Sequence, residues 1–361
     1  MIGDTHPGSN PAESLRFWGQ PRNSSFRSLL CALAMALPAC GDDDDDDAGT
    51  GEHVLEWRVA LEDLDGAILS LWGPSISDLF AVGGSLGADG GQAIILWSDG
   101  QAWHEQDAGD APTLWWVFGL AHDAVWAVGE RGTILRFDGD EWSTVATGAD
   151  YTLWGVWGAN ESDLWAVGGS AIVDAPPVIL RWDGSGWEPM APPTGDERGL
   201  YFKVWGASAD DVYIVGAGGA ILHWDGEELS LMESPSTDRL VTVVGRGPGD
   251  VWAVGGLGMP VALHLADGAW AAVTDPAFVE GLMGVWTAPD QLVVVSGFRG
   301  YLAVGDEGGF TEQASPTDLC LHGVWGDAKG NFAAGGGDLL LPAPPKGTIV
   351  AVGAVPDGPV E

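Results

Sequence analysis

The sequence of 361 residues predicts an all-β fold, a seven-bladed β-propeller whose blades are four-stranded antiparallel sheets. Three observations support this prediction: one phrase recurs seven times, each copy divides into short runs rich in β-branched and aromatic residues, and turn residues separate the runs. The copies are anchored on a Trp-Gly step or its substitute, at Trp72, Phe118, Trp157, Trp205, Val244, Trp286 and Trp325. These anchors lie on average about 42 residues apart, a spacing typical of propeller blades.

A single blade is clearest in the second copy, which contains four runs that we name strands A to D. The runs are residues 114–120, 124–129, 133–137 and 141–145, none of them long enough for an ordinary helix. Between strands C and D lies Asp138-Gly139, a strong hairpin signal, because both central residues of a type I′ turn need positive φ. The same dipeptide recurs at Asp99-Gly100, Asp183-Gly184, Asp225-Gly226 and Asp267-Gly268. Each blade is therefore predicted to be a meander.

The inner strands are apolar on both sides. The run Val125-Trp126-Ala127-Val128 leaves no side for solvent, as expected of a sheet packed between two neighbouring sheets. A lone meander cannot bury two faces, so the blades are predicted to stack around a closed ring.

The last copy supplies strands A to C, at residues 322–325, 331–334 and 348–352, and has no strand D. Residues 54–61 contain Glu56-Trp57, which matches the start of strand D in the second copy. We therefore predict that this N-terminal strand completes the seventh blade and closes the ring. The propeller then spans residues 53–355, followed by a C-terminal tail at 356–361.

The repeats resemble those of seven-bladed β-propellers in bacterial envelope proteins, which carry the pattern WG…DVWAVG…G.I.RWDG..W; the resemblance covers residues 54–355. The turn before each outer-strand Trp is also similar to the Asp-box of sialidase-like propellers and to kelch-like repeats. In Ser98-Asp99-Gly100-Gln101-Ala102-Trp103 the residue that the box places between its Asp and Gly is missing. In those families the box is a structural turn remote from the active centre, so the resemblance implies a fold and no particular activity.

The N-terminus has the pattern of an export signal. Three arginines precede the apolar run 28–39, which is too short to span a bilayer but suits the core of a signal peptide. The run ends in Leu37-Pro38-Ala39-Cys40, which resembles a bacterial lipobox. The resemblance implies a signal peptide at residues 1–39 and an acylated Cys40, carrying palmitate-type chains, as the first mature residue. A plain secretory signal with an incidental cysteine is the alternative.

Residues 40–52 are predicted to form an acidic tether, because the six adjacent carboxylates of Asp42 to Asp47 repel one another and bury nothing. Calcium binding is the alternative, although turn-forming glycines are missing between these residues.

Residues 1–39 hold two of the 52 acidic and three of the 14 basic side chains, so the mature chain carries a net charge of about −39. This charge argues against nucleic acid as a partner and against electrostatic docking on anionic lipid. Membrane attachment then depends on the acyl chains of Cys40, and we expect a monomer in a Gram-negative envelope, on the outer membrane, facing the periplasm or the cell surface.

Residues that recur in every blade are expected to be structural. This applies to the tryptophans of strands A, B and D, expected to fill space between blades, with Trp115 beside the repeat position as the exception and a candidate binding residue. It applies also to the aspartates before strand B, which are expected to bond turn backbone: Asp78, Asp123, Asp163, Asp211, Asp250 and Asp290.

A binding site is instead expected on the face that carries the B to C turns and the D to A linkers, which we name the loop face. Long connections gather there, at residues 85–91, 107–112, 169–177, 192–199, 255–260, 275–281 and 335–347. Insertions on one face of a repeat protein commonly mark its binding face. Arg131 and Arg299 fall in tight B to C turns of this face and are candidates to receive a carboxylate or an acidic sugar, with surface arginines in turns as the simpler interpretation.

Catalytic, metal and cofactor patterns are missing. The histidines have no HxH, HxxxH or Cys/His spacing, and no GxSxG or Walker A motif occurs, so no catalytic residue, metal site or cofactor is predicted. We expect a non-enzymatic, lipid-anchored binding or scaffold protein that engages an envelope protein or glycan. Two alternatives remain open: an enzyme acting on polysaccharide or glycoside, and a purely structural envelope component. Carboxylates and arginines clustered at the channel mouth would favour the enzyme, and an open apolar patch among the long loops would favour the binding protein.

Overall fold

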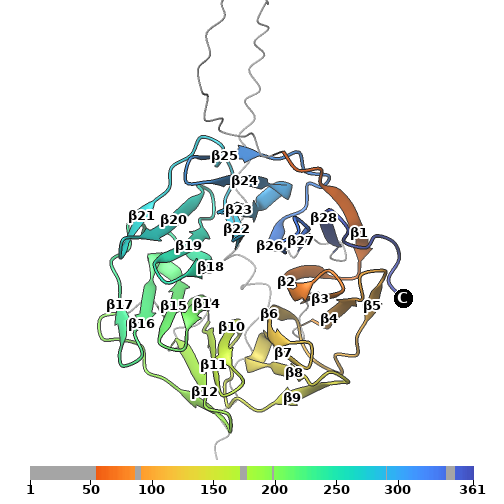
Figure 1. Cartoon of the computed structure of the whole chain (residues 1–361). Coiled ribbons are helices and arrows are strands. Elements are labelled where there is room, and N and C mark those ends of the chain that lie inside the picture. Colours follow the sequence, from red (N-terminus) through yellow and green to blue (C-terminus); the bar gives the residue numbers. More distant parts are fainter. Residues whose placement is uncertain (1–53, 86–90, 171–176, 197–198, 290, 339–345) are drawn as a thin grey trace, which may run out of the picture.

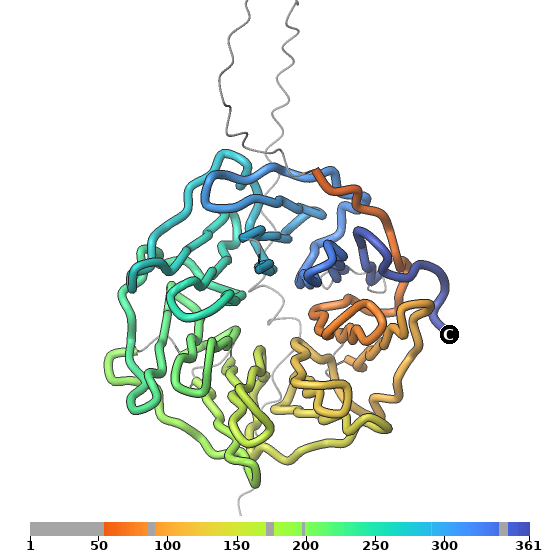
Figure 2. Tube along the Cα trace, viewed as in Figure 1, coloured from red at the N-terminus to blue at the C-terminus, as the bar shows by residue number. Residues whose placement is uncertain are grey.

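The computed structural model describes residues 54–85, 91–170, 177–196, 199–289, 291–338 and 346–361. In this part of the chain seven four-stranded antiparallel sheets surround a common axis, so the predicted all-β propeller of seven blades is confirmed (Figures 1 and 2). None of the helical segments in these residues is long and apolar enough to cross a membrane.

Each blade is a meander whose first strand is innermost, except that the outermost strand of the last blade comes from the N-terminal side. From inside to outside the strands are β2 (Ala67–Ser75), β3 (Asp78–Gly84), β4 (Ala93–Ser98) and β5 (Trp103–Glu105) in blade one; β6 (Leu114–Ala121), β7 (Ala124–Gly129), β8 (Ile134–Phe137) and β9 (Trp142–Val145) in blade two; β10 (Leu153–Asn160), β11 (Asp163–Gly168), β12 (Val178–Trp182) and β13 (Trp187–Pro189) in blade three; β14 (Tyr201–Ser208), β15 (Asp211–Gly216), β16 (Ile221–Trp224) and β17 (Leu229–Leu231) in blade four; β18 (Leu240–Gly247), β19 (Asp250–Gly255), β20 (Val261–Ala266) and β21 (Ala269–Ala272) in blade five; β22 (Leu282–Thr287), β23 (Val293–Gly297), β24 (Leu302–Asp306) and β25 (Gly309–Glu312) in blade six; and β26 (Leu321–Gly326), β27 (Phe332–Gly337), β28 (Gly347–Val352) and β1 (Arg58–Leu64) in blade seven.

The Trp-Gly repeat is explained by packing between neighbouring blades. The indole of Trp157 in β10 lies against Gly206 of β14, where an added Cβ would come within 2.5 Å of the ring. Trp205 lies in the same way against Gly245 of the next blade, at 2.6 Å. A side chain at either glycine would clash with the rigid indole ring. The Gly therefore allows the blades to approach closely, and the Trp fills the space between them.

Most of the Asp-Gly turns differ from the predicted type I′ geometry. Only Asp267-Gly268 has positive φ at both residues, and only there does a two-residue loop join the pair Ala266 and Ala269. In the other four the loop has four residues, and the Asp side chain accepts the backbone N–H groups two and three residues on, as Asp99 does from Gln101 and Ala102 at 2.7 and 2.9 Å. The Asp side chain, rather than a left-handed backbone, holds these turns.

Four of the aspartates before strand B bind side chains, which corrects the expectation that they bond turn backbone: Asp78, Asp163, Asp211 and Asp250. Asp290 lies outside the described residues. Asp163 accepts two bonds from Arg181 at 2.9 and 3.0 Å, and Asp211 accepts one from His223 at 2.7 Å. In each case the partner lies on strand C of the same blade. These carboxylates therefore cross-link neighbouring strands of a blade.

The predicted closure is present, with a shifted strand. β1 runs from Arg58 to Leu64, rather than over 54–61, and pairs antiparallel with β28. Trp57 lies just before the strand because its ring packs into the core between blades six and seven, 6.3 Å from the Phe332 ring centroid. The ladder continues to Leu64 because β28 extends back to Gly347.

A second contact follows the last strand. The Trp103 Nε1 atom donates to Pro356 O at 3.1 Å, and backbone bonds join Glu361 to Trp103 and Glu105 at 2.8 and 3.1 Å. The tail at 356–361 thus lies along β5 of blade one and joins the last blade to the first.

Candidate functional site at the channel mouth

The seven innermost strands share one irregularity near their start. In every blade the register between the first and second strands shifts by one residue at this point, which marks a β-bulge. The residues at the shifts are Leu69, Trp115, Trp154, Phe202, Val241, Met283 and His322. All seven line one central cavity, so the repeated bulge turns one side chain of each blade to the same place.

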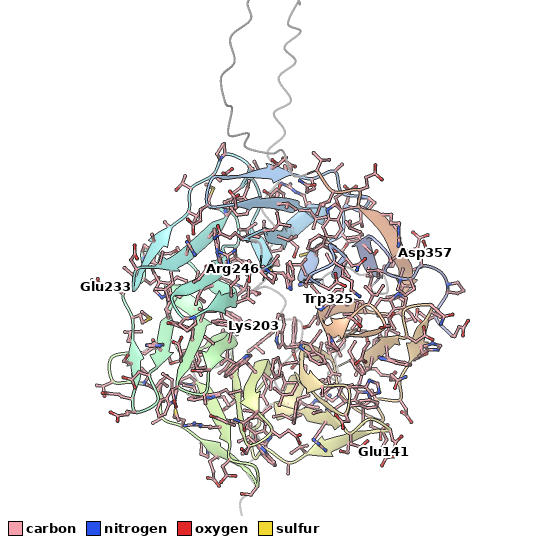
Figure 3. The ribbon with its side chains drawn as sticks, in the orientation of Figure 1. Glu141, Lys203, Glu233, Arg246, Trp325 and Asp357 are labelled. Atoms are coloured by element: carbon pink, nitrogen blue, oxygen red, sulfur yellow. The ribbon has the colours of Figure 1, made fainter. Side chains whose placement is uncertain are left out.

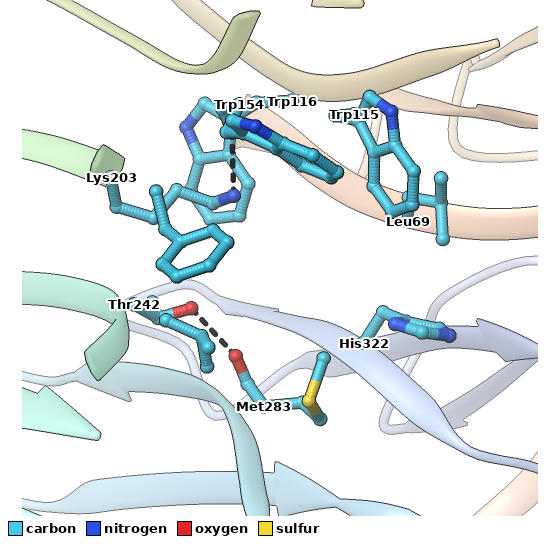
Figure 4. A pocket seen from close by; sticks show the side chains of 10 residues that line it. Leu69, Trp115, Trp116, Trp154, Lys203, Thr242, Met283 and His322 are labelled. Carbon is cyan, nitrogen blue, oxygen red and sulfur yellow. Dashed lines mark hydrogen bonds between the residues drawn. The ribbon is translucent and has the colours of Figure 1, made fainter. Parts of the chain in front are cut away.

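The cavity lies at the loop face. The Trp115 Nε1 atom donates to Glu130 Oε1 at 2.8 Å, and Glu130 begins the B to C turn η2 (Glu130–Gly132). Besides the seven bulge residues, Trp116, Lys203 and Thr242 line the cavity (Figure 4). Its volume is about 20 Å³, enough for one water molecule, and it is partly open to solvent.

The walls of the cavity are mainly aromatic. The ring centroids of Trp115 and Trp154 are 4.4 Å apart, and Phe202 meets Trp154 edge-on at 5.8 Å. The Trp154 Nε1 atom donates to Gly169 O at 3.2 Å, which fixes the ring. These side chains are at most 7% exposed and form the plug of the channel.

Lys203 is the charged residue of this plug. It follows the bulge residue of β14, is 8% exposed, and lies beside the centre of the ring, whereas Glu141, Glu233 and Asp357 lie at the rim (Figure 3). Its Nζ atom donates to Trp154 O at 2.6 Å and lies 4.4 Å from the centroid of the Trp116 ring. Burial lowers the pKa of Lys203 to about 7, because the ammonium loses its hydration.

His322 of β26 lines the same cavity and is the other titratable residue in its described wall. Burial lowers the pKa of His322 to about 4, and the nearby Lys203 charge acts in the same direction. At neutral pH His322 is therefore an uncharged imidazole. The described wall offers the basic groups of Lys203 and His322, the Thr242 hydroxyl and apolar side chains, and no carboxylate.

Of the predicted binding residues, the structure places only one in the described wall of the cavity. Trp115 lines the cavity. Arg131 and Arg299 occupy equivalent turns, η2 and η4 (Phe298–Gly300), with φ of 57° and 56°, a conformation that Gly218 adopts in blade four. Both are exposed, neither lines the cavity, and Arg299 forms an ion pair with Glu280. Cys40 lies outside the described residues.

Lys203, His322, Trp154 and Trp116 also line the cavity and were not predicted as site residues. One sequence feature points to them: at the equivalent position the residue type changes from blade to blade, whereas the residues directly beside it repeat. Among residues 54–361 with the gaps given above, no group of three or more His, Cys, Asp or Glu side chains is placed to hold a metal ion.

A second feature of the loop face is an exposed apolar pair. Met259 is 73% exposed in the B to C loop of blade five, and Val279 is 54% exposed in the linker to blade six. The two loops touch, since an added Cβ at Gly281 would lie 2.7 Å from Gly256 O. We name Met259 and Val279 the apolar pair. On the opposite face Leu120, at the end of β6, is 36% exposed.

No family model matches the sequence, and no curated protein matches it. Solved structures with the same architecture include the WD40 β-propeller domain of Doa1, at a TM-score of 0.63 and 12% identity over 82% of this chain and 97% of that one. YCF48 from Cyanidioschyzon merolae aligns at 0.60 and 12% identity over 82% and 98%. A structure of YCF48 bound to D1 peptide aligns at 0.60 and 13% over 84% and 97%. At these identities the likeness shows the fold alone, and it extends along almost the whole length of these structures.

Proposed function

We propose that this chain is a non-enzymatic binding protein of the bacterial envelope, held to a membrane by acyl chains on Cys40, and that its loop face binds a partner protein. The apolar pair carries this proposal. Single exposed apolar residues are common, but here two large ones lie on touching loops of the face where the connections vary most in length. An ion pair between Arg299 and Glu280 lies next to Val279, so an apolar centre has polar groups at its edge, as protein interfaces do.

The chemistry of the channel mouth also favours binding over hydrolysis. Glycoside hydrolysis commonly uses two carboxylates on either side of the scissile bond. The described wall of the cavity instead presents Lys203, His322 and aromatic rings. Among the structural neighbours, one structure holds YCF48 with a D1 peptide, an instance of this architecture binding a polypeptide.

The partner is tested by capture on the propeller from an envelope extract. The double variant Met259→Asp, Val279→Asp places two charges in the apolar pair and is expected to lower recovery of the partner at least roughly tenfold, because a desolvated carboxylate opposes an apolar contact. Leu120→Asp is the control, since it places one charge at an exposed apolar residue on the opposite face. Equal recovery by both variants contradicts the loop face as the binding surface, and recovery of glycan in place of protein redirects the proposal to a glycan-binding protein.

The anchor is tested separately. Incorporation of an alkyne-labelled fatty acid in cells should be lost in Cys40→Ala, and the variant should leave the membrane fraction. Retention of label in that variant contradicts acylation at Cys40.

A further inference from the structure

Lys203 is a buried cation with few partners. The Lys203 ammonium group meets the Trp116 ring of β6 and donates to Trp154 O of β10, and Thr242 of β18 lines the same cavity. The Thr242 hydroxyl donates to Met283 O at 2.6 Å, so its proton is already engaged in a hydrogen bond. His322 from β26 is the other titratable group in the described wall (Figure 4).

This environment is unusual in so acidic a chain. The net charge is −38, and the sequence contains only three lysines, yet one of them is buried among three tryptophans without a carboxylate in the described wall of its cavity. An ammonium has three N–H donors, and here one bonds a carbonyl oxygen while one face meets an indole. A buried cation of this kind is stabilised most by an anion that reaches it.

The cavity suits a carboxylate that carries an apolar group. We propose that the channel mouth binds a carboxylate on Lys203, with the attached hydrocarbon part over Trp115, Trp116 and Trp154. The cavity is small and partly open, so the carboxylate enters it and the remainder of the ligand stays towards solvent. The carboxylate can belong to a small organic acid or to the C-terminus of a polypeptide. The site is independent of the apolar pair and stands whether or not that pair binds a protein.

The primary experiment is a ligand-observed NMR titration of the propeller, residues 51–361, with butyrate and with butyramide, which has nearly the same shape and no charge. Butyrate is expected to bind at least roughly tenfold more tightly, since a bond to a charged donor is lost in the amide. Since burial lowers the pKa of Lys203 to about 7, butyrate affinity should fall roughly tenfold for each pH unit above that value. The His322 imidazole, uncharged over this range, does not add to the trend.

A second pair of probes distinguishes the source of the carboxylate. The peptide Gly-Gly-Ala-Ala-Val is compared with the same peptide amidated at its C-terminus. Binding of butyrate supports a site for free organic acids, and binding of the free-acid peptide alone supports a site for a chain terminus. If neither carboxylate binds, or if each binds as its amide does, the proposal is overturned.

Variants connect the binding to the residue. Lys203→Met keeps length and removes the charge, and is expected to abolish the difference between carboxylate and amide. Lys329→Met, at an exposed lysine on the opposite face, is the control and should bind as the wild type does. Should Lys203→Met fail to fold, Lys203→Gln serves in its place. Undiminished discrimination by a folded Lys203 variant contradicts the assignment.

Discussion

Lys203 shows how one residue can lower the stability of the fold that contains it. Its folded-state pKa is about 7, whereas an exposed lysine has a pKa near 10.4. Above that higher value the amine is neutral in both states and contributes nothing. Between the two values the unfolded chain binds a proton that the folded chain does not, so the free energy of unfolding increases as the pH rises from about 7 towards 10. Below a pH of about 7 the amine is protonated in both states, and its burial lowers the free energy of unfolding by about 1.4 kcal/mol for each unit of pKa difference.

We therefore predict that Lys203→Met stabilises the propeller at pH 7 by a few kcal/mol and much less at pH 10. Urea unfolding of wild type and variant at the two pH values measures the difference. Lys329→Met should leave the wild-type profile unchanged, since the replaced amine is exposed. A Lys203→Met variant that is less stable than wild type at pH 7 would contradict this prediction, because it would show that contacts of the ammonium group outweigh the cost of burying its charge.

Among the elements, the turns between third and fourth strands offer a matched comparison. Gly268 has φ of 79° and no atom within 4 Å of an added Cβ, so a side chain there changes only the backbone energy. Gly186, in the turn after β12, also has open space around it and does not adopt positive φ. Gly268→Ala is expected to destabilise the protein by about 1 kcal/mol, and Gly186→Ala to be neutral or slightly stabilising. Equal effects in chemical denaturation would contradict the assigned difference between the two turns.

The closing strand and the tail make unequal contributions. β1 pairs antiparallel with β28 along its whole length, with two register shifts, and buries Ala60 and Leu61, whereas the tail at 356–361 adds a few bonds along β5. Deletion of residues 54–64 is expected to lower the melting temperature far more than deletion of 356–361, because it also exposes the edge of β28. Thermal unfolding measures both, and size-exclusion chromatography should show self-association in the first deletion only. An unchanged melting temperature after loss of 54–64 would contradict closure by this strand.

The elements also show what sequence could and could not predict. The period of the Trp-Gly phrase was sufficient to predict seven meander blades. The absence of a fourth strand in the last repeat was sufficient to predict closure of the ring by the N-terminal strand. The type I′ geometry was predicted from the Asp-Gly dipeptide alone, but the turn conformation depends on the length of the loop. Of the five Asp-Gly turns, only Asp267-Gly268 forms a two-residue loop between paired strands, and only this turn has positive φ at both residues. The cavity could not be predicted, because the sequence does not show where a strand contains a bulge. A bulge reverses the alternation of side chains along the strand, and the bulge beside Lys203 therefore determines whether this side chain faces a neighbouring blade or the channel.

For the whole molecule, the ring separates two kinds of surface. The face of the A to B and C to D turns repeats from blade to blade, and its aspartates hold strands and turns together. The loop face holds the residues that do not repeat: the aromatic plug with Lys203, and the apolar pair formed by Met259 and Val279. This separation supports our proposal that the loop face binds a partner and that the opposite face is scaffold.

The most direct test of that assignment is site-specific photocrosslinking in cells. A photoreactive amino acid is placed at position 259, 279 or 120, each an exposed apolar position in the wild type. If the loop face binds the partner, positions 259 and 279 crosslink to the same protein and position 120 does not. Crosslinks from position 120 to the partner, without crosslinks from 259 and 279, would contradict it.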